Sequence, residues 1–122
     1  MTELASTMTP CEIAVQAAHA IAALNELTHG GGELSNPDDV RAIVGSLELI
    51  GGGLPMLCEQ LARFLVVQQE DGQLDHEAGL DEDDLVTEVV EALAAAGQAA
   101  DMMTAALSEA RAASSALFPR GR

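Results

Sequence analysis

Apolar residues recur at spacings of three and four along most of this chain, which is the pattern of amphipathic helices. The first such stretch follows Thr9, which can cap a helix, and Pro10, which fits a first helical turn. Glu12 lies three residues after Thr9, so the two side chains can form a capping box. We therefore predict a helix over residues 10–29, preceded by a flexible tail over residues 1–8.

Two glycine triplets interrupt the apolar pattern. The first, residues 30–32, is predicted to end the first helix, because glycine adopts the left-handed conformation of a helix end at little cost. The second, Gly51–Gly53, is followed by Pro55. Glycine and proline cost about 1 and 3 kcal/mol inside a helix. The second triplet therefore favours a turn between antiparallel helices over residues 37–50 and 54–69.

The apolar spacing nevertheless keeps its phase through the second triplet. Apolar residues follow one another at intervals of four and three from Ile43 to Phe64, and a reversal of chain direction would not need this. One long arm kinked at Gly51–Gly53 is therefore the alternative. Of the two interpretations, we favour the turn slightly.

The clearest element is a long C-terminal helix over residues 83–117, which carries a heptad repeat without a slip. At 1.5 Å per residue it spans about 50 Å. Residues 70–82 precede it as an acidic loop, and residues 119–122 follow it as a short basic tail. The seam of the repeat consists of Val86, Val89, Leu93, Ala96, Ala100, Met103, Leu107, Ala110, Ser114 and Leu117. These segments predict an all-α, up-down bundle of about four helices in a single domain, residues 1–122.

The net charge of the chain limits the classes of molecule that it is expected to bind. Twenty acidic residues face five arginines and no lysine, which gives a formal net charge of −15. This balance argues against direct nucleic-acid binding, because that affinity comes from Lys and Arg at the phosphates. It argues equally against binding to anionic membranes, and it permits a basic protein as partner. Arginine without lysine, together with abundant Ala and Gly, is typical of a high-GC, actinobacterial-like genome.

Neither an N-terminal signal pattern nor a run of about 18 apolar residues occurs, so we expect a cytoplasmic protein without a membrane span. Cys11 and Cys58 are then expected to be reduced thiols packed as small apolar groups. No metal or cofactor is expected. The three histidines lack the spacing of zinc ligands, and the acidic loop lacks the spacing of a calcium loop. Because no motif joins a nucleophile to a base, we predict that the protein is not an enzyme.

The predicted function is that of a non-enzymatic protein–protein interaction or regulatory module, which forms a homodimer through its C-terminal helix. The expected interface residues are Ala96, Ala100, Met102, Met103, Leu107 and Ala110. Met102 lies off the heptad seam and is a candidate for a second interface. An electrostatic contact with a basic protein is expected at Asp81, Glu82, Asp83 and Asp84.

Two alternatives stay open. The first is an acidic nucleic-acid mimic, of the type found in phages and mobile elements, that inhibits a nucleic-acid-binding protein. The second is a helical hairpin secreted without a signal peptide. Ala-rich hairpins of actinobacterial type VII systems carry Trp-x-Gly in the turn and a Tyr-led acidic signal, whereas this chain contains neither Trp nor Tyr.

Overall fold

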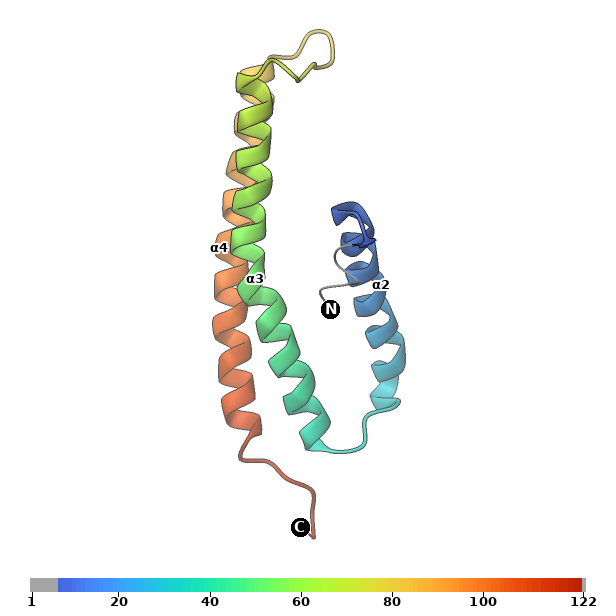
Figure 1. Cartoon of the computed structure of the whole chain (residues 1–122). Coiled ribbons are helices and arrows are strands. Elements are labelled where there is room, and N and C mark those ends of the chain that lie inside the picture. Colours follow the sequence, from blue (N-terminus) through green and yellow to red (C-terminus); the bar gives the residue numbers. More distant parts are fainter. Residues whose placement is uncertain (1–6, 122) are drawn as a thin grey trace. The chain divides into compact units, whose positions relative to one another are not determined.

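A computed structural model of the chain describes residues 7–121. Their regular structure is entirely helical, without strands: α2 (Pro10–Thr28), η1 (His29–Gly31), α3 (Pro37–Glu70) and α4 (Glu82–Ser114) (Figure 1). The chain forms two compact units, Met1–Asn36 and Pro37–Arg122. Most of the predicted tail over residues 1–8, and the last residue of the predicted basic tail, lie outside the described residues.

Helix α2 begins with the predicted capping box. The backbone N–H of Glu12 donates to Thr9 Oγ1 at 3.1 Å, and the backbone N–H of Thr9 donates to Glu12 Oε1 at 3.0 Å. The helix ends at Thr28, and the short 3-10 helix η1 follows it. Gly30 and Gly31 have φ values of 62° and 88°, which glycine adopts without strain. The prediction for this element is confirmed to within one residue.

Helix α3 corrects the predicted count of four helices. It continues through Gly51–Gly53 and Pro55, so residues 37–50 and 54–69 belong to one helix, and the kinked arm is the correct alternative. Pro55 cannot donate to the carbonyl of residue 51, and its ring crowds that carbonyl. Glycines at positions 51–53 give the backbone the freedom to bend there, and Figure 1 shows α3 changing direction near its middle.

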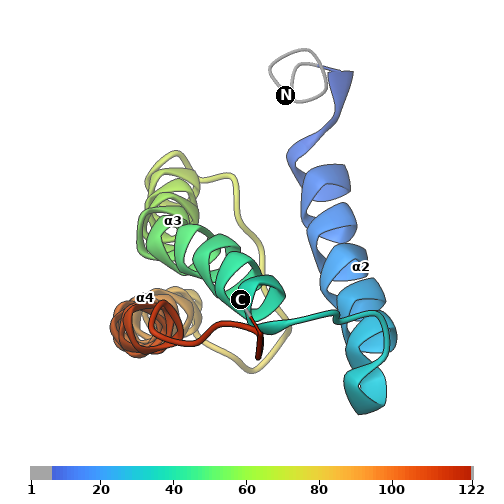
Figure 2. The ribbon, with the colours of Figure 1, turned by 90° about the horizontal axis from the view of Figure 1, so that it is seen from below.

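Helices α3 and α4 form an antiparallel hairpin, and they lie side by side in both ribbon views (Figures 1 and 2). Residues 71–81 connect them at what we call the hairpin tip. Gly72, with φ 68°, ends α3 in a Schellman motif: its N–H donates to the carbonyl of Gln69, and the N–H of Gln73 donates to that of Gln68. The predicted acidic loop, residues 70–82, therefore corresponds to this tip.

Helix α4 begins one residue earlier than predicted, at Glu82, and also ends earlier than predicted. Asp81 is its N-cap, since its carboxylate accepts the backbone N–H of Asp84 at 3.0 Å. The predicted end at residue 117 is wrong by three residues, because the helix stops at Ser114. The hydroxyls of Ser114 and Ser115 donate to the carbonyls of Arg111 and Ala112, so these side chains compete with the backbone for helical acceptors.

Small residues bring the two helices of the hairpin close together. Gly51 of α3 is buried, and a Cβ built there would lie 2.9 Å from Met103 Cε. Gly97 of α4 is also buried, and a Cβ there would lie 3.5 Å from Pro55 Cα. Among the described residues, only Val86 and Ala100 are buried hydrophobic side chains. The hairpin is therefore held by a narrow seam, and most of its large apolar side chains remain exposed.

Candidate interaction surface

The predicted heptad seam of α4 divides into two halves in the structure. Residues spaced by seven from Val86 to Ser114 are buried or half-buried against α3; they are Val86, Leu93, Ala100, Leu107 and Ser114. The other half is exposed; it consists of Val89, Ala96, Met103, Ala110 and Leu117. Gly97 and Thr104 complete the contact with α3. Each of them directly follows a residue of the exposed half, Ala96 or Met103.

Helix α3 has an exposed apolar stripe of the same kind. Its members are Ile50, Leu57, Leu61 and Phe64, which are between 47 and 62% exposed. They belong to the apolar series that the sequence singled out, but sequence reasoning did not identify them as interface residues. Their spacing of seven, four and three was the signal that could have identified them.

The two stripes lie on the same side of the hairpin. Most of these exposed residues directly precede a buried or half-buried position, as Ile50 precedes Gly51, and Met103 precedes Thr104. Successive residues of an α-helix turn by about 100°, and in an antiparallel pair the preceding positions of both helices turn to the same side. We call this surface the open face. It consists of Ile50, Leu57, Leu61, Phe64, Val89, Ala96, Met103 and Ala110.

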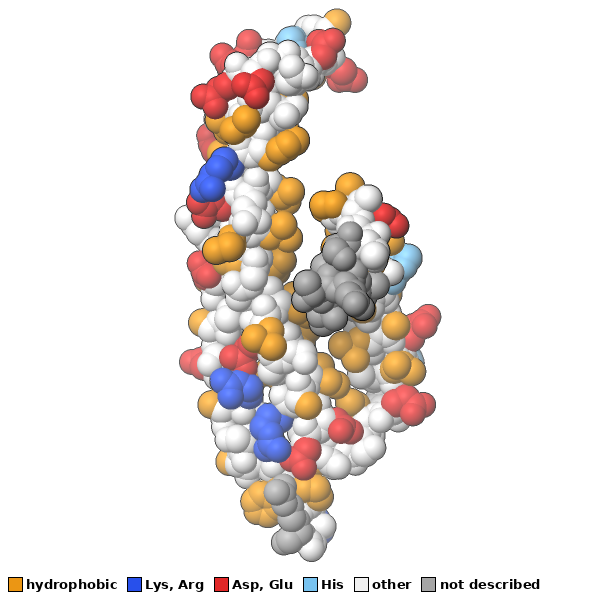
Figure 3. All heavy atoms as spheres, viewed as in Figure 1, with side chains coloured by type: hydrophobic (Ala, Val, Ile, Leu, Met, Phe, Trp, Pro, Cys, Tyr) orange, Lys and Arg blue, Asp and Glu red, His pale blue; other side chains and the backbone are white. Residues whose placement is uncertain are grey.

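Charged side chains avoid the open face. Between the two ends of α3, the charged residues follow one another at intervals of 7, 11 and 4, which places them in one stripe of their own; they are Arg41, Glu48, Glu59 and Arg63. Figure 3 shows hydrophobic side chains along one edge of the upper half of α3, with acidic and basic side chains along the opposite edge of that half of the hairpin. The part of the open face that α3 provides is therefore uncharged.

The charged side of the hairpin carries one ion pair between its helices. The Arg111 guanidinium of α4 donates to the Glu48 carboxylate of α3. This hydrogen bond and the charge of Glu48 raise the pKa of Arg111 above its ordinary value. Two further pairs lie within α3, Arg41 with Asp38 at 2.7 Å and Arg63 with Glu59 at 2.6 Å.

The structure divides the predicted interface residues among three environments. Ala100 is buried and Leu107 half-buried against α3, so both belong to the interior of the hairpin. Ala96, Met103 and Ala110 belong to the open face. Met102 is 75% exposed and lies outside the open face, on the outer surface of α4.

The predicted electrostatic cluster, Asp81–Asp84, lies where the hairpin tip joins α4, and three of its carboxylates make local contacts. Asp81 caps the helix, as described above. Asp83 Oδ1 accepts a hydrogen bond from the Gln69 side chain of α3, at 2.5 Å. Glu82 Oε1 lies 3.8 Å from His76 Nδ1. These carboxylates therefore help to hold the tip of the hairpin together.

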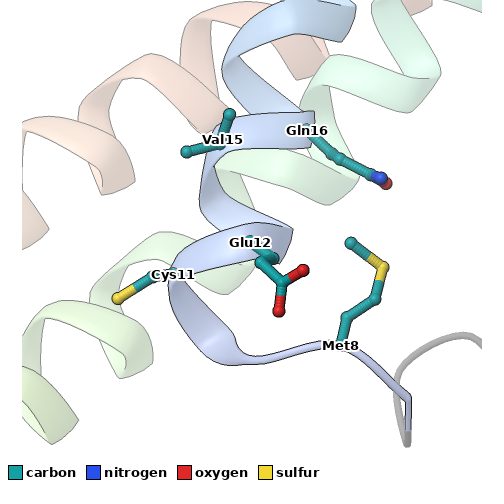
Figure 4. Close-up of a pocket in the computed structure, with 5 residues that line it drawn as sticks. All are labelled: Met8, Cys11, Glu12, Val15 and Gln16. Atoms are coloured by element: carbon teal, nitrogen blue, oxygen red, sulfur yellow. The ribbon is translucent and has the colours of Figure 1, made fainter.

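A shallow pocket of about 330 Å³ lies at the start of α2. Its lining residues are Met8, Cys11, Glu12, Val15 and Gln16 (Figure 4). Hydrogen bonds from the backbone and side chain of Thr9 lower the pKa of Glu12. Because this carboxylate serves as a cap, and Cys11 is an exposed free thiol without a neighbouring base in the pocket, the lining offers no acid–base pair.

Within the described residues, no three His, Cys, Asp or Glu side chains are grouped so that they could hold a metal ion. Of the described helices, α3 alone is long and apolar enough to cross a membrane, by a test of length and composition that core helices also pass. No protein-family model, curated protein or solved structure matches this chain.

Proposed function

We propose that this protein is a non-enzymatic helical interaction module that associates with itself through the open face of the α3–α4 hairpin. The observation that supports this proposal is the face itself: eight apolar residues from two helices, none charged, on a hairpin with few buried hydrophobic side chains. Two helices alone bury little apolar surface, and stable domains cover their apolar faces with another element. An uncovered apolar strip rimmed by polar residues is typical of a protein interface.

Two adjacent methionines of α4 provide a matched pair for the test. Met103 belongs to the open face and is 41% exposed, whereas Met102 is 75% exposed on the outer surface of the same helix. In a dimer that covers the open face, Met103→Glu places an unpaired carboxylate in an apolar contact, which is costly. Met102→Glu makes the same chemical change outside that contact.

The measurement is the mass in solution by sedimentation velocity across a concentration series, with helicity followed by circular dichroism. We expect Met103→Glu to raise the dissociation constant at least tenfold, and Met102→Glu to leave it within about twofold. Helicity should stay unchanged in both variants. Dissociation by Met102→Glu alone would move the interface to the outer surface of α4, and a monomeric wild-type protein would overturn self-association.

A further inference from the structure

The dimensions of the open face indicate what can cover it. The open face runs from Ile50 to Phe64 on α3 and from Val89 to Ala110 on α4, which is about 20 Å and 30 Å of helix at 1.5 Å per residue. Because each helix is about 10 Å wide, the face measures about 500 Å². A standard protein interface buries about 800 Å² on each partner. The open face therefore provides more than half of such an interface, and the residues at its rim would provide the rest.

A second hairpin of this chain matches that surface in width, and α2 does not. Helix α2 has 19 residues, so it is about 28 Å long and one helix wide. It has the length of the open face but would cover only one of the two helices that form it. A second copy also has an open face without charged residues. The contact between two copies therefore need not include the negatively charged residues of the chain.

Charge is unevenly distributed between the two ends of the hairpin. The region from Glu70 to Asp84 contains eight acidic residues and neither Lys nor Arg. The opposite end is close to neutral, because Arg41, Arg111 and Arg120 balance most of the charge of Asp38, Asp39, Glu48 and Glu109. Two tips placed together would bring sixteen carboxylates within about two helix diameters. Placed at opposite ends, they lie about 50 Å apart, which is several times the screening length of about 8 Å at physiological salt.

We infer that two copies pair antiparallel through their open faces, with the tip of each hairpin beside the arginine-bearing end of the other. This inference rests on the proposed self-association. In such a dimer the twofold axis crosses the middle of the face at right angles to the helices. Helix α3 then packs on the partner's α3, and α4 on the partner's α4, as a four-helix assembly.

Alanines suit this arrangement along α4. Ala96 and Ala110 are exposed on the open face, and small side chains let two helix backbones approach closely. The larger side chains of α3, Leu57 and Leu61 among them, then pack against the partner's α3. The two layers of the dimer therefore combine a close α4–α4 contact with a wider α3–α3 contact.

The test is a distance between the two tips. In a background with Cys11 and Cys58 replaced by Ala, the variant Asp75→Cys carries one spin label per chain at the tip. Pulsed electron paramagnetic resonance on the dimer should give a label separation of about 50 Å or more. With the tips together, two layers of helices about 10 Å apart would bring the labels within about 30 Å.

A second label at Gln98→Cys, near the middle of α4, provides the control, because its separation differs little between the two orientations. A dimer with tips within 30 Å would overturn the antiparallel arrangement and leave self-association intact. A monomer at 100 µM, measured by sedimentation on the unlabelled chain, would overturn both. A monomer that binds phosphatidylcholine vesicles would replace the second copy with a lipid surface.

Discussion

The two glycine triplets of this chain adopt different conformations. Gly30–Gly32 follows α2 and leads the chain out of the helix, whereas Gly51–Gly53 lies inside α3 and remains helical. Their local sequences predict the same behaviour, because a glycine triplet opposes helix propagation in either place. What differs is the surroundings, so the comparison shows how tertiary contacts override a strong local preference.

The second triplet is supported by α4. Gly51 packs against Thr104 and Met103, in a space where a larger residue would collide. Apolar residues continue in phase beyond it, and Pro55 packs against Gly97. In the first triplet, a Cβ at Gly30 or at Gly31 would meet nothing within 4 Å, and one at Gly32 would meet the backbone of Leu27 and His29 in the same turn. Three experiments test whether α4 accounts for the difference, from the largest expected effect to the smallest.

The largest effect should come from placing a charge in the seam. Ala100 is 6% exposed, so Ala100→Glu would bury a carboxylate without a partner and destabilise the hairpin by several kcal/mol. We expect the melting temperature to fall by more than about 10 °C, measured by circular dichroism at 222 nm. Ala105→Glu, on the exposed surface of the same helix, should change it by less than about 3 °C. Equal shifts in both variants would contradict the support by α4.

Within the second triplet, one glycine should behave differently from its neighbour. Gly52→Ala meets no atom within 4 Å and gains helix propensity, so it should stabilise the protein by about 0.5–1 kcal/mol. Gly51→Ala gains the same propensity, but its Cβ would collide with the Thr104 hydroxyl and Met103, so it should destabilise by about 1 kcal/mol. Urea unfolding of both variants measures the difference. Thr104→Ala should partly rescue Gly51→Ala; stabilisation by both glycine replacements would show that Gly51 is not closely packed.

The smallest effect should be local to the first triplet. Gly31 has φ 88°, a conformation that costs an L-residue about 1–2 kcal/mol. Gly31→Ala should therefore loosen the turn in which the Leu34 N–H donates to the Gly31 carbonyl, at 3.0 Å. We expect amide hydrogen exchange at Leu34 to accelerate about tenfold, while the melting temperature of the hairpin stays the same. A fall in that temperature would mean that the first triplet also supports the hairpin.

Much of the fold was predictable because local chemistry decides it. The capping box at Thr9 starts α2, and the Asp81 cap starts α4. The unbroken apolar phase between Ile43 and Phe64 indicated a continuous α3, although the cost of Gly51–Gly53 and Pro55 favoured the turn. Helix propensity predicted this region less well than the apolar spacing did, because packing on α4 compensates for the poor helix formers Gly51–Gly53 and Pro55.

The candidate interface was predictable only in part. A heptad repeat shows which positions of α4 are apolar, but it cannot show which flank packs on α3. Gly97 and Thr104 fit against Pro55 and Gly51, because small residues allow close approach, and this leaves Met103 at the edge of the contact, with its Cε beside Gly51 and much of its side chain exposed. Which flank packs on α3 depends on how side chains of the two helices fit together, at positions 42 and 53 residues apart in the sequence. The spacing of apolar residues along one helix carries no information about that fit.

The short tip of the hairpin has a consequence for the order of folding. Residues 71–81 join two long helices, so contacts beside the tip close small loops, whereas the Glu48–Arg111 pair closes a loop of more than 60 residues. Loop closure is entropically cheapest for the shortest loops. The helices should therefore pair first near the tip. Pairing should then proceed toward the opposite end of the hairpin, where Glu48 and Arg111 are among the last residues to make contact.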